Sequence, residues 1–179
     1  LALREGIAAK VEHLYGATFD PLTEVVVTSG ATAGLYATLT TFVHPGDEVL
    51  LFEPCYDSYV PVIRLSGGTP VFVSLRYPDY LVNWDDVRRA ITPRMRAILV
   101  NTPDNPTGTT WSADDMRQLQ AIVDGTNIIV IGDEVYEHII FDGRRHESLL
   151  RYPDLRARSV VISSFGKTFH TTGWKVGYC

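Results

Sequence analysis

The stretch NIIVIGDEVYEH, residues 127–138, decides the fold class, because its first half is apolar at consecutive positions and its second half turns polar at once. A strand with one face in water alternates apolar and polar residues, whereas a strand covered on both faces is apolar throughout. RAILV, residues 96–100, has the same pattern and is followed by the polar NTPDNPTG, residues 101–108. These runs therefore predict parallel strands buried between helices.

Outward from these runs, short segments rich in β-branched residues alternate with longer amphipathic ones. That order predicts an α/β protein with a mostly parallel central sheet and helices on both faces, in three α/β/α layers. Ser112 and Asp115 have the spacing of a capping box at a helix start. Further strands are predicted within residues 24–30, 48–54, 70–75 and 159–165, and helices within residues 31–43, 86–91 and 112–123.

The composition indicates one folded domain or a large piece of one, since 45% of the 179 residues are hydrophobic. The net charge is −5 with both signs spread along the chain, which argues against nucleic-acid and membrane partners. Cys55 and Cys179 are too few for a disulfide framework and lack metal-site spacing, so we expect a cytoplasmic protein with no metal site. Because the chain begins LALREG, without methionine, and ends within patterned sequence, we expect it to be a fragment.

Polar segments follow the predicted strands, and in open α/β sheets ligands bind outside the carboxyl ends of the strands. We therefore expect these segments to share one edge of the sheet and to form a binding site there. They are TSGAT at 28–32, EPCYDSY at 53–59, NTPDNPTG at 101–108, DEVYEH at 133–138 and SSFGK at 163–167.

Lys167 follows a strand within Gly-Lys-Thr, which matches the tail of a nucleotide-binding P-loop. That loop needs a glycine five positions before Gly166, and Val161 stands there instead. The segment TSGAT also lacks the GxGxxG of a dinucleotide fold, so neither a P-loop nor NAD binding is favoured. The lysine needs another explanation.

Two of the polar segments allow a structural and a functional interpretation. In TSGAT, the helix start can bind an anion through free backbone amides, or Ser29 can simply cap a tight turn. In DEVY, Asp133 can be a helix N-cap, or a carboxylate held against a protonated ring nitrogen with the Tyr136 hydroxyl nearby. Both alternatives stay open from the residues alone.

The segments NTPDNPTG and EPCYDSY also allow both a structural and a functional interpretation. NTPDNPTG is a turn in any case, yet it places the amide side chains of Asn101 and Asn105 at the end of a strand. Tyr56 is either a core or edge aromatic or a platform on which a planar ligand stacks. A lysine beside an anion site, a carboxylate and a phenol can form a Schiff base, and this combination of groups describes a pyridoxal phosphate site.

At this point the sequence resembles a known family. The segments TSGATAGL, EPCYDSY, NTPDNPTG, DEVYEHIIFDG and SSFGKTFHTTGWKVGYC are similar to those of the class I/II, fold-type I aminotransferases, and the similarity runs from Leu1 to Cys179. Within the family it points to the methionine aminotransferases, kynurenine aminotransferases and cysteine-S-conjugate β-lyases. The resemblance implies that residues 1–179 are the truncated pyridoxal-phosphate-binding large domain of an aspartate aminotransferase-like fold, without its N-terminal arm and C-terminal small domain, in a homodimer.

The resemblance also implies a role for each matching residue. Lys167 would be the Schiff-base lysine and move a proton between substrate and cofactor, while Asp133 would pair with the protonated pyridine nitrogen. Tyr136 would be the third catalytic residue and would bind the phenolate oxygen together with Asn105, which would also border the substrate. The remaining cofactor contacts would be Gly30, Ala31, Thr32, Ser164 and Lys175 at the phosphate, and Tyr56 stacked on the ring.

The implied function is an aminotransferase of amino acid metabolism. It would exchange the amino group between an amino acid, with methionine, glutamine, kynurenine or another aromatic favoured, and a 2-oxo acid by a ping-pong Schiff-base mechanism. A cysteine-S-conjugate β-lyase uses the same lysine and cofactor and is the alternative. A more distant alternative is the aminotransferase-like sensor domain of a transcription regulator.

Overall fold

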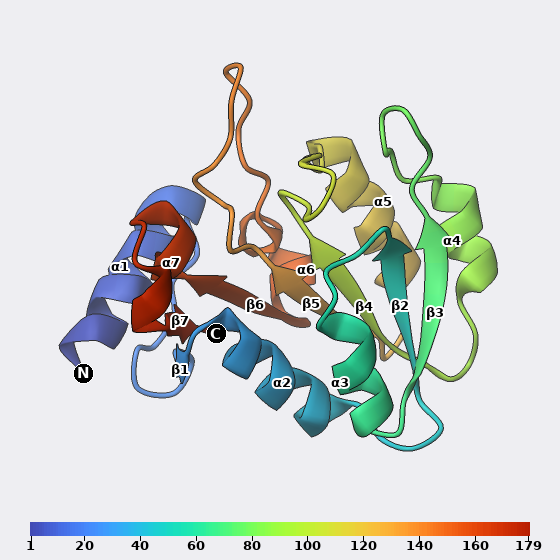
Figure 1. Ribbon diagram of the computed structural model, residues 1–179, viewed down its shortest axis with the longest axis horizontal. Coiled ribbons are helices and arrows are strands. Elements are labelled where there is room, and N and C mark those ends of the chain that lie inside the picture. Colours follow the sequence, from blue (N-terminus) through green and yellow to red (C-terminus); the bar gives the residue numbers. More distant parts are fainter.

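The computed structural model describes residues 1–179, and its centre is a seven-stranded sheet flanked by helices (Figure 1). The predicted α/β class is confirmed. Each of the six predicted strand segments contains a strand, and a seventh strand closes the chain. In spatial order the strands are β1 (Val27–Ser29), β7 (Val176–Tyr178), β6 (Ser159–Ser164), β5 (Ile129–Asp133), β4 (Met95–Asn101), β2 (Glu48–Glu53) and β3 (Thr69–Ser74).

The sheet is parallel except at one edge. The neighbours β3, β2, β4, β5 and β6 all pair in parallel, as consecutive apolar positions predict. Strand β7 lies between β1 and β6 and is antiparallel to both, with Tyr178 opposite Val27 on one side and Ser163 on the other. This seventh strand was not predicted, because WKVGYC at residues 174–179 contains only one β-branched residue, whereas β1 lies in the β-branched run EVVVTSG.

Helices cover both faces of the sheet. Each of the three predicted helical segments overlaps a helix, although α4 begins at Trp84, before the predicted residue 86. The capping box is present: the Asp115 amide donates to Ser112 Oγ at 3.2 Å, and the Ser112 amide donates to Asp115 Oδ2 at 2.8 Å. None of the helices combines the length and apolarity that crossing a bilayer requires. The helices are α1 (Ala2–Tyr15), α2 (Ala31–Phe42), α3 (Tyr59–Leu65), α4 (Trp84–Ala90), α5 (Ala113–Val123), α6 (Pro153–Arg156) and α7 (Phe165–Thr168).

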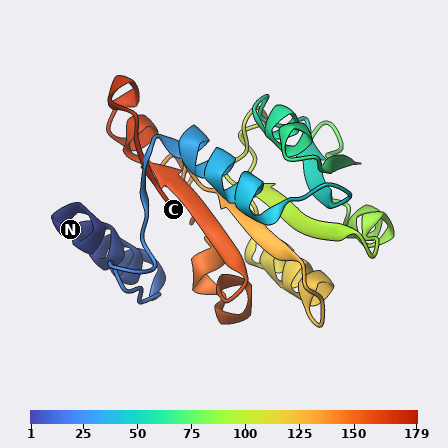
Figure 2. The ribbon, with the colours of Figure 1, turned by 90° about the horizontal axis from the view of Figure 1, so that it is seen from below.

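Two hydrophobic cores explain the apolar strands. Figure 2 shows α2 and α3 on one side of the sheet and α5 and α6 on the other. Along β2, Val49 and Leu51 belong to the core under α2 and α3, whereas Leu50 and Phe52 belong to the core under α4, α5 and α6. Since successive side chains of a strand point to opposite faces, a strand between two helical layers must be apolar at every position. Polar residues therefore occur where the strands end, outside the two helical layers.

Candidate active site

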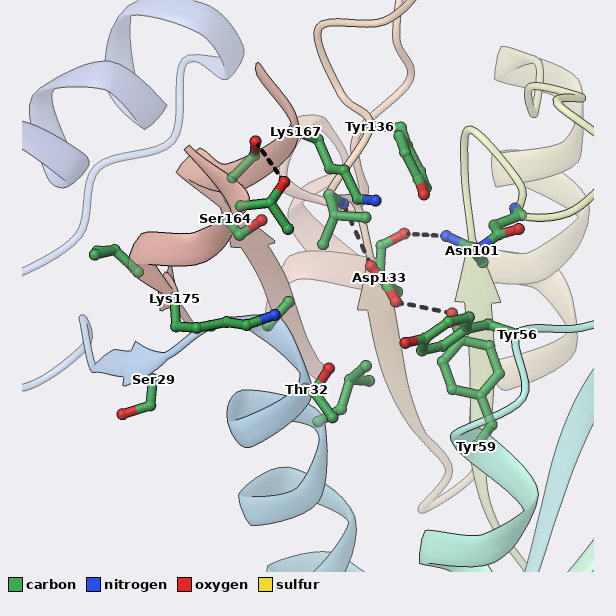
Figure 3. Close-up of a pocket in the computed structure, with 18 residues that line it drawn as sticks. Ser29, Thr32, Tyr56, Tyr59, Asn101, Asp133, Tyr136, Ser164, Lys167 and Lys175 are labelled. Atoms are coloured by element: carbon green, nitrogen blue, oxygen red, sulfur yellow. Dashed lines mark hydrogen bonds between the residues drawn. The ribbon is translucent and has the colours of Figure 1, made fainter. Parts of the chain in front are cut away.

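A cavity of about 410 Å³ lies at the carboxyl ends of β4, β5 and β6 and is bordered by the start of α2 (Figure 3). This is the edge at which the sequence predicted a site. The structure brings all ten predicted site residues to the cavity wall, although they come from six separate segments. They are Gly30, Ala31, Thr32, Tyr56, Asn105, Asp133, Tyr136, Ser164, Lys167 and Lys175.

Asp133 ends β5 and is buried, with 4% of the residue exposed. Oδ2 accepts a hydrogen bond from the Tyr59 hydroxyl at 2.8 Å, and Oδ1 accepts one from the Val135 amide at 3.3 Å. Burial raises the pKa of Asp133 to about 6, because these two neutral donors offset only part of the cost of desolvating the charge. A turn follows Asp133 rather than a helix, so the N-cap interpretation is wrong.

Tyr59 is a site residue that the sequence reasoning missed. It begins α3, is 2% exposed, and stands edge-on to Tyr56 with ring centroids 5.6 Å apart. Burial and the neighbouring carboxylate of Asp133 raise the pKa of the Tyr59 phenol, which therefore stays protonated and donates to Asp133. The available signal was the second tyrosine in EPCYDSY, three positions after Tyr56.

Asn101 and Asn105 both line the cavity, and Asn101 also holds the loop that carries Asn105. Asn101 Nδ2 donates to the backbone oxygen of Asp133 at 2.9 Å, and its Oδ1 accepts from the backbone amide of Asn105 at 2.8 Å. One buried side chain thus ties the loop after β4 to the end of β5. The relative positions of Asn105 and Asp133 depend on this link.

Lys167 lies in α7, directly after β6. Its Nζ is 5.4 Å from the centre of the Tyr136 ring, and no carboxylate pairs with it. Figure 3 shows the side chain pointing into the cavity between Tyr136 and Asp133. The cavity therefore contains a lysine amine that forms no ion pair with a carboxylate of the protein.

The opposite side of the cavity is formed by the start of α2. Gly30 is the N-cap residue, with φ 80° and ψ 169°, and no side chain caps the helix. The interpretation of Ser29 as the cap is therefore wrong. The unpaired amides of the first helical turn and the helix dipole attract an anion. Figure 3 shows Lys175 extending toward this turn, on the side of Thr32.

Gly177 in β7 packs directly against this turn. A Cβ atom at position 177 would lie 2.5 Å from the Gly30 carbonyl carbon and 2.6 Å from the Ala31 amide nitrogen. We expect Gly177→Ala to displace the turn and to lower the free energy of unfolding by about 1–3 kcal/mol, as overpacking does. Urea denaturation measures this loss. Gly173→Ala is the matched control, since nothing lies within 4 Å of a Cβ there; equal stability of the two variants would contradict the packing argument.

Comparisons with known proteins agree with this geometry. The family model for aminotransferase class I and II matches residues 1–179. The chain is 49% identical to the methionine aminotransferase of Escherichia coli strain K12, covering 99% of this chain and 46% of that protein. It is 33% identical to the kynurenine–oxoglutarate transaminase of Dictyostelium discoideum, covering 100% of this chain and 45% of that protein. The chain thus spans about half the length of these curated relatives.

Solved structures give the same result. A crystal structure from Escherichia coli, described as identifying a methionine aminotransferase function, superposes with a TM-score of 0.98 at 49% identity and covers 99% of this chain and 47% of that one. The N-succinyldiaminopimelate aminotransferase from Mycobacterium tuberculosis superposes with a TM-score of 0.95 at 44% identity and covers 98% and 46%.

Proposed function

This chain belongs to the class I and II aminotransferases, and from that membership we propose that it is the cofactor-binding domain of an aminotransferase that uses pyridoxal phosphate. The observation that carries the proposal is the placement of Lys167 and Asp133 in one cavity, an amine without an ion-pair partner and a buried carboxylate without a cation. In this proposal, residues 1–179 form the large domain, and the rest of a longer protein supplies the small domain.

The residues fit pyridoxal phosphate at each of its polar groups. Asp133 has only neutral partners in the protein, so a protonated ring nitrogen would satisfy its charge and bring its pKa down again. The start of α2, with Ser164 and Lys175, offers donors and positive charge for the phosphate. Tyr56 offers an aromatic face to the ring.

When bound, pyridoxal phosphate supplies an aldehyde that condenses with amines and a ring that accepts an electron pair. Asp133 would hold the proton on the ring nitrogen, while Tyr136 and Asn105 would donate hydrogen bonds to the ring oxygen. Tyr59 would orient the Asp133 carboxylate through its 2.8 Å hydrogen bond. Lys167 would hold the cofactor and, once free, would carry the proton that leaves the α-carbon of the amino acid.

We favour methionine as the amino donor, because the methionine aminotransferase is 49% identical to this chain. Kynurenine and other aromatic amino acids come next, on the 33% identical kynurenine transaminase. Glutamine remains a candidate on the subgroup resemblance alone. We also propose that the protein is a cytoplasmic homodimer with a 2-oxo acid as the second substrate.

An absorbance titration of the complete protein tests this function. With pyridoxal phosphate added, we expect a visible band that methionine bleaches and that a 2-oxo acid restores, as a ping-pong exchange requires. Kynurenine, glutamine and aspartate, offered separately, rank the donors. Release of pyruvate from a cysteine S-conjugate without any 2-oxo acid would instead indicate a β-lyase. A protein without the band, at saturating cofactor, would reject the cofactor and the function together.

A further inference from the structure

A buried carboxylate beside the cavity gathers four donors. Glu137, with a side chain 4% exposed, lies in the turn that follows β5. Its Oε1 accepts hydrogen bonds from Lys10 Nζ at 2.6 Å, Ser163 Oγ at 2.6 Å and the Tyr178 hydroxyl at 3.2 Å. Its Oε2 accepts one from the Tyr15 hydroxyl. We call these five residues the Glu137 cluster. None of them lines the cavity.

The Glu137 cluster joins separate parts of the chain next to the site. Lys10 and Tyr15 come from α1, Ser163 from β6 and Tyr178 from β7. Two members are direct sequence neighbours of cavity residues: Glu137 follows Tyr136, and Ser163 precedes Ser164. A shift of the Glu137 carboxylate would therefore move both neighbours.

The carboxylate is charged as well as buried. Burial alone would raise the pKa of Glu137, but the Lys10 ammonium and the hydrogen bonds from Lys10, Ser163 and Tyr15 outweigh it and hold the pKa below its usual range. An ionised acceptor binds its donors about twice as strongly as a neutral one. The cluster is thus a rigid anchor rather than a loose surface pair.

Tyr136 needs such an anchor, because it lies in the turn that follows β5 and its hydroxyl makes no hydrogen bond within the protein. The turn is held by a buried carboxylate on each side of Tyr136. Glu134 binds His146 Nε2 at 2.7 Å and the Leu149 amide at 3.0 Å, and Glu137 binds the cluster. Buried carboxylates with several hydrogen bonds therefore lie on both sides of Tyr136 in the sequence.

We propose that Glu137 is a positioning residue: its carboxylate, fixed by Lys10, Tyr15, Ser163 and Tyr178, sets the places of Tyr136 and Ser164 in the cavity. Helix α1 thereby acts on the cofactor site without touching it. This inference rests on the proposed function, since it assigns Tyr136 to the ring oxygen of pyridoxal phosphate and Ser164 to its phosphate.

The test compares Glu137→Gln with Glu48→Gln in the complete protein. Glu48 is the matched control, because it is 5% exposed and binds Arg94 Nε at 3.0 Å at the amino end of β2, far from the cavity. Both variants lose a buried charge and should melt at lower temperature. Only Glu137→Gln should raise the Kd for pyridoxal phosphate, by about tenfold, the lower end of what losing an outer-shell partner costs at metal sites.

A second readout reports on the Tyr136 phenol. The visible band of the cofactor held by Lys167 changes with pH, and a hydrogen bond to the ring oxygen favours the deprotonated form. The midpoint of this titration should therefore move to higher pH in Glu137→Gln and stay in place in Glu48→Gln. Tyr15→Phe keeps the Lys10–Glu137 ion pair, so we expect it to fold even if Glu137→Gln does not. It should raise the Kd and the pH midpoint as Glu137→Gln does, but by smaller amounts.

The outcomes separate the two proposals. A wild-type protein without the visible band rejects the proposed function and this inference with it. A wild-type protein with the band, combined with Glu137→Gln and Tyr15→Phe variants whose Kd and pH midpoint match those of Glu48→Gln, rejects the positioning role alone. Glu137 would then only stabilise the fold.

Discussion

Lys167→Ala is expected to abolish the visible absorbance of bound pyridoxal phosphate and to lower transamination by at least about 10³-fold. The variant removes the amine that would hold the cofactor and also a proton transfer worth about 10²–10⁴-fold by itself. Lys167 Nζ faces Tyr136 and Asp133, and no protein carboxylate ties it down. Absorbance spectra and initial rates with methionine measure the two losses.

Lys175→Gln is the control for this result, because Lys175 brings the second amine to the same cavity. We expect it to keep the visible band and to weaken only the binding of the cofactor, since its amine would meet the phosphate. A band that survives in Lys167→Ala and disappears in Lys175→Gln would exchange the roles of the two lysines.

Asp133→Asn is expected to have opposite effects on stability and on activity. In the cofactor-free protein the pKa of Asp133 is about 6, against 3.8 for an ordinary aspartate. Because the folded state binds this proton more tightly than the unfolded state, the stabilisation is complete below pH 3.8 and is lost as the pH rises through 6. At pH 8 the ionised carboxylate thus costs the folded state about 3 kcal/mol relative to its protonated form.

An asparagine at position 133 is neutral at every pH; its Oδ1 can accept from the Val135 amide, and its Nδ2 can donate to the Tyr59 hydroxyl, which then acts as acceptor. Cofactor-free Asp133→Asn should therefore show a higher free energy of unfolding than the wild type at pH 8, and the difference should vanish near pH 4; urea denaturation of the complete protein measures both. With pyridoxal phosphate bound, the order should reverse and transamination should fall by about 10²-fold or more, since the ring nitrogen loses its counter-charge. A wild-type advantage at pH 8 without cofactor would contradict the assigned pKa.

The sequence predicted those features that are local along the chain. Residues 96–100 and 127–132 reveal buried parallel strands because consecutive apolar positions require cover on both faces. The polar residues after each strand, including Asp133 and Lys167, locate the site because parallel strands end at the same edge. The predicted site residues meet at the cavity for this reason, except Lys175, which directly precedes the antiparallel strand β7.

What the sequence did not predict depends on partners that are distant along the chain. In the sequence, Tyr59 has the features of an ordinary core aromatic. Its role depends on the fold, which brings its hydroxyl within 2.8 Å of Asp133 Oδ2. Lys10 and Glu137 have no pattern in common, yet they form a 2.6 Å ion pair. Ser29 looked like a cap because serine is a common cap residue, but the left-handed φ of Gly30 gives that position to glycine.

The place of β7 in the sheet has a consequence for how the protein is made. Val27 pairs with Tyr178, which comes far later in the sequence, so β1 has no neighbour in the sheet until β7 has been synthesised. Until then the two strand edges that β7 later covers, one on β1 and one on β6, stay open and invite pairing with other chains. Gly30 and Ser164 lie on either side of β7, so their relative positions in the cavity are fixed only once β7 is in the sheet. The anion-binding side of the cavity is therefore completed only once β7 is in place, after the buried residues of the core under α2 and α3 and of the core under α4, α5 and α6 have all been synthesised.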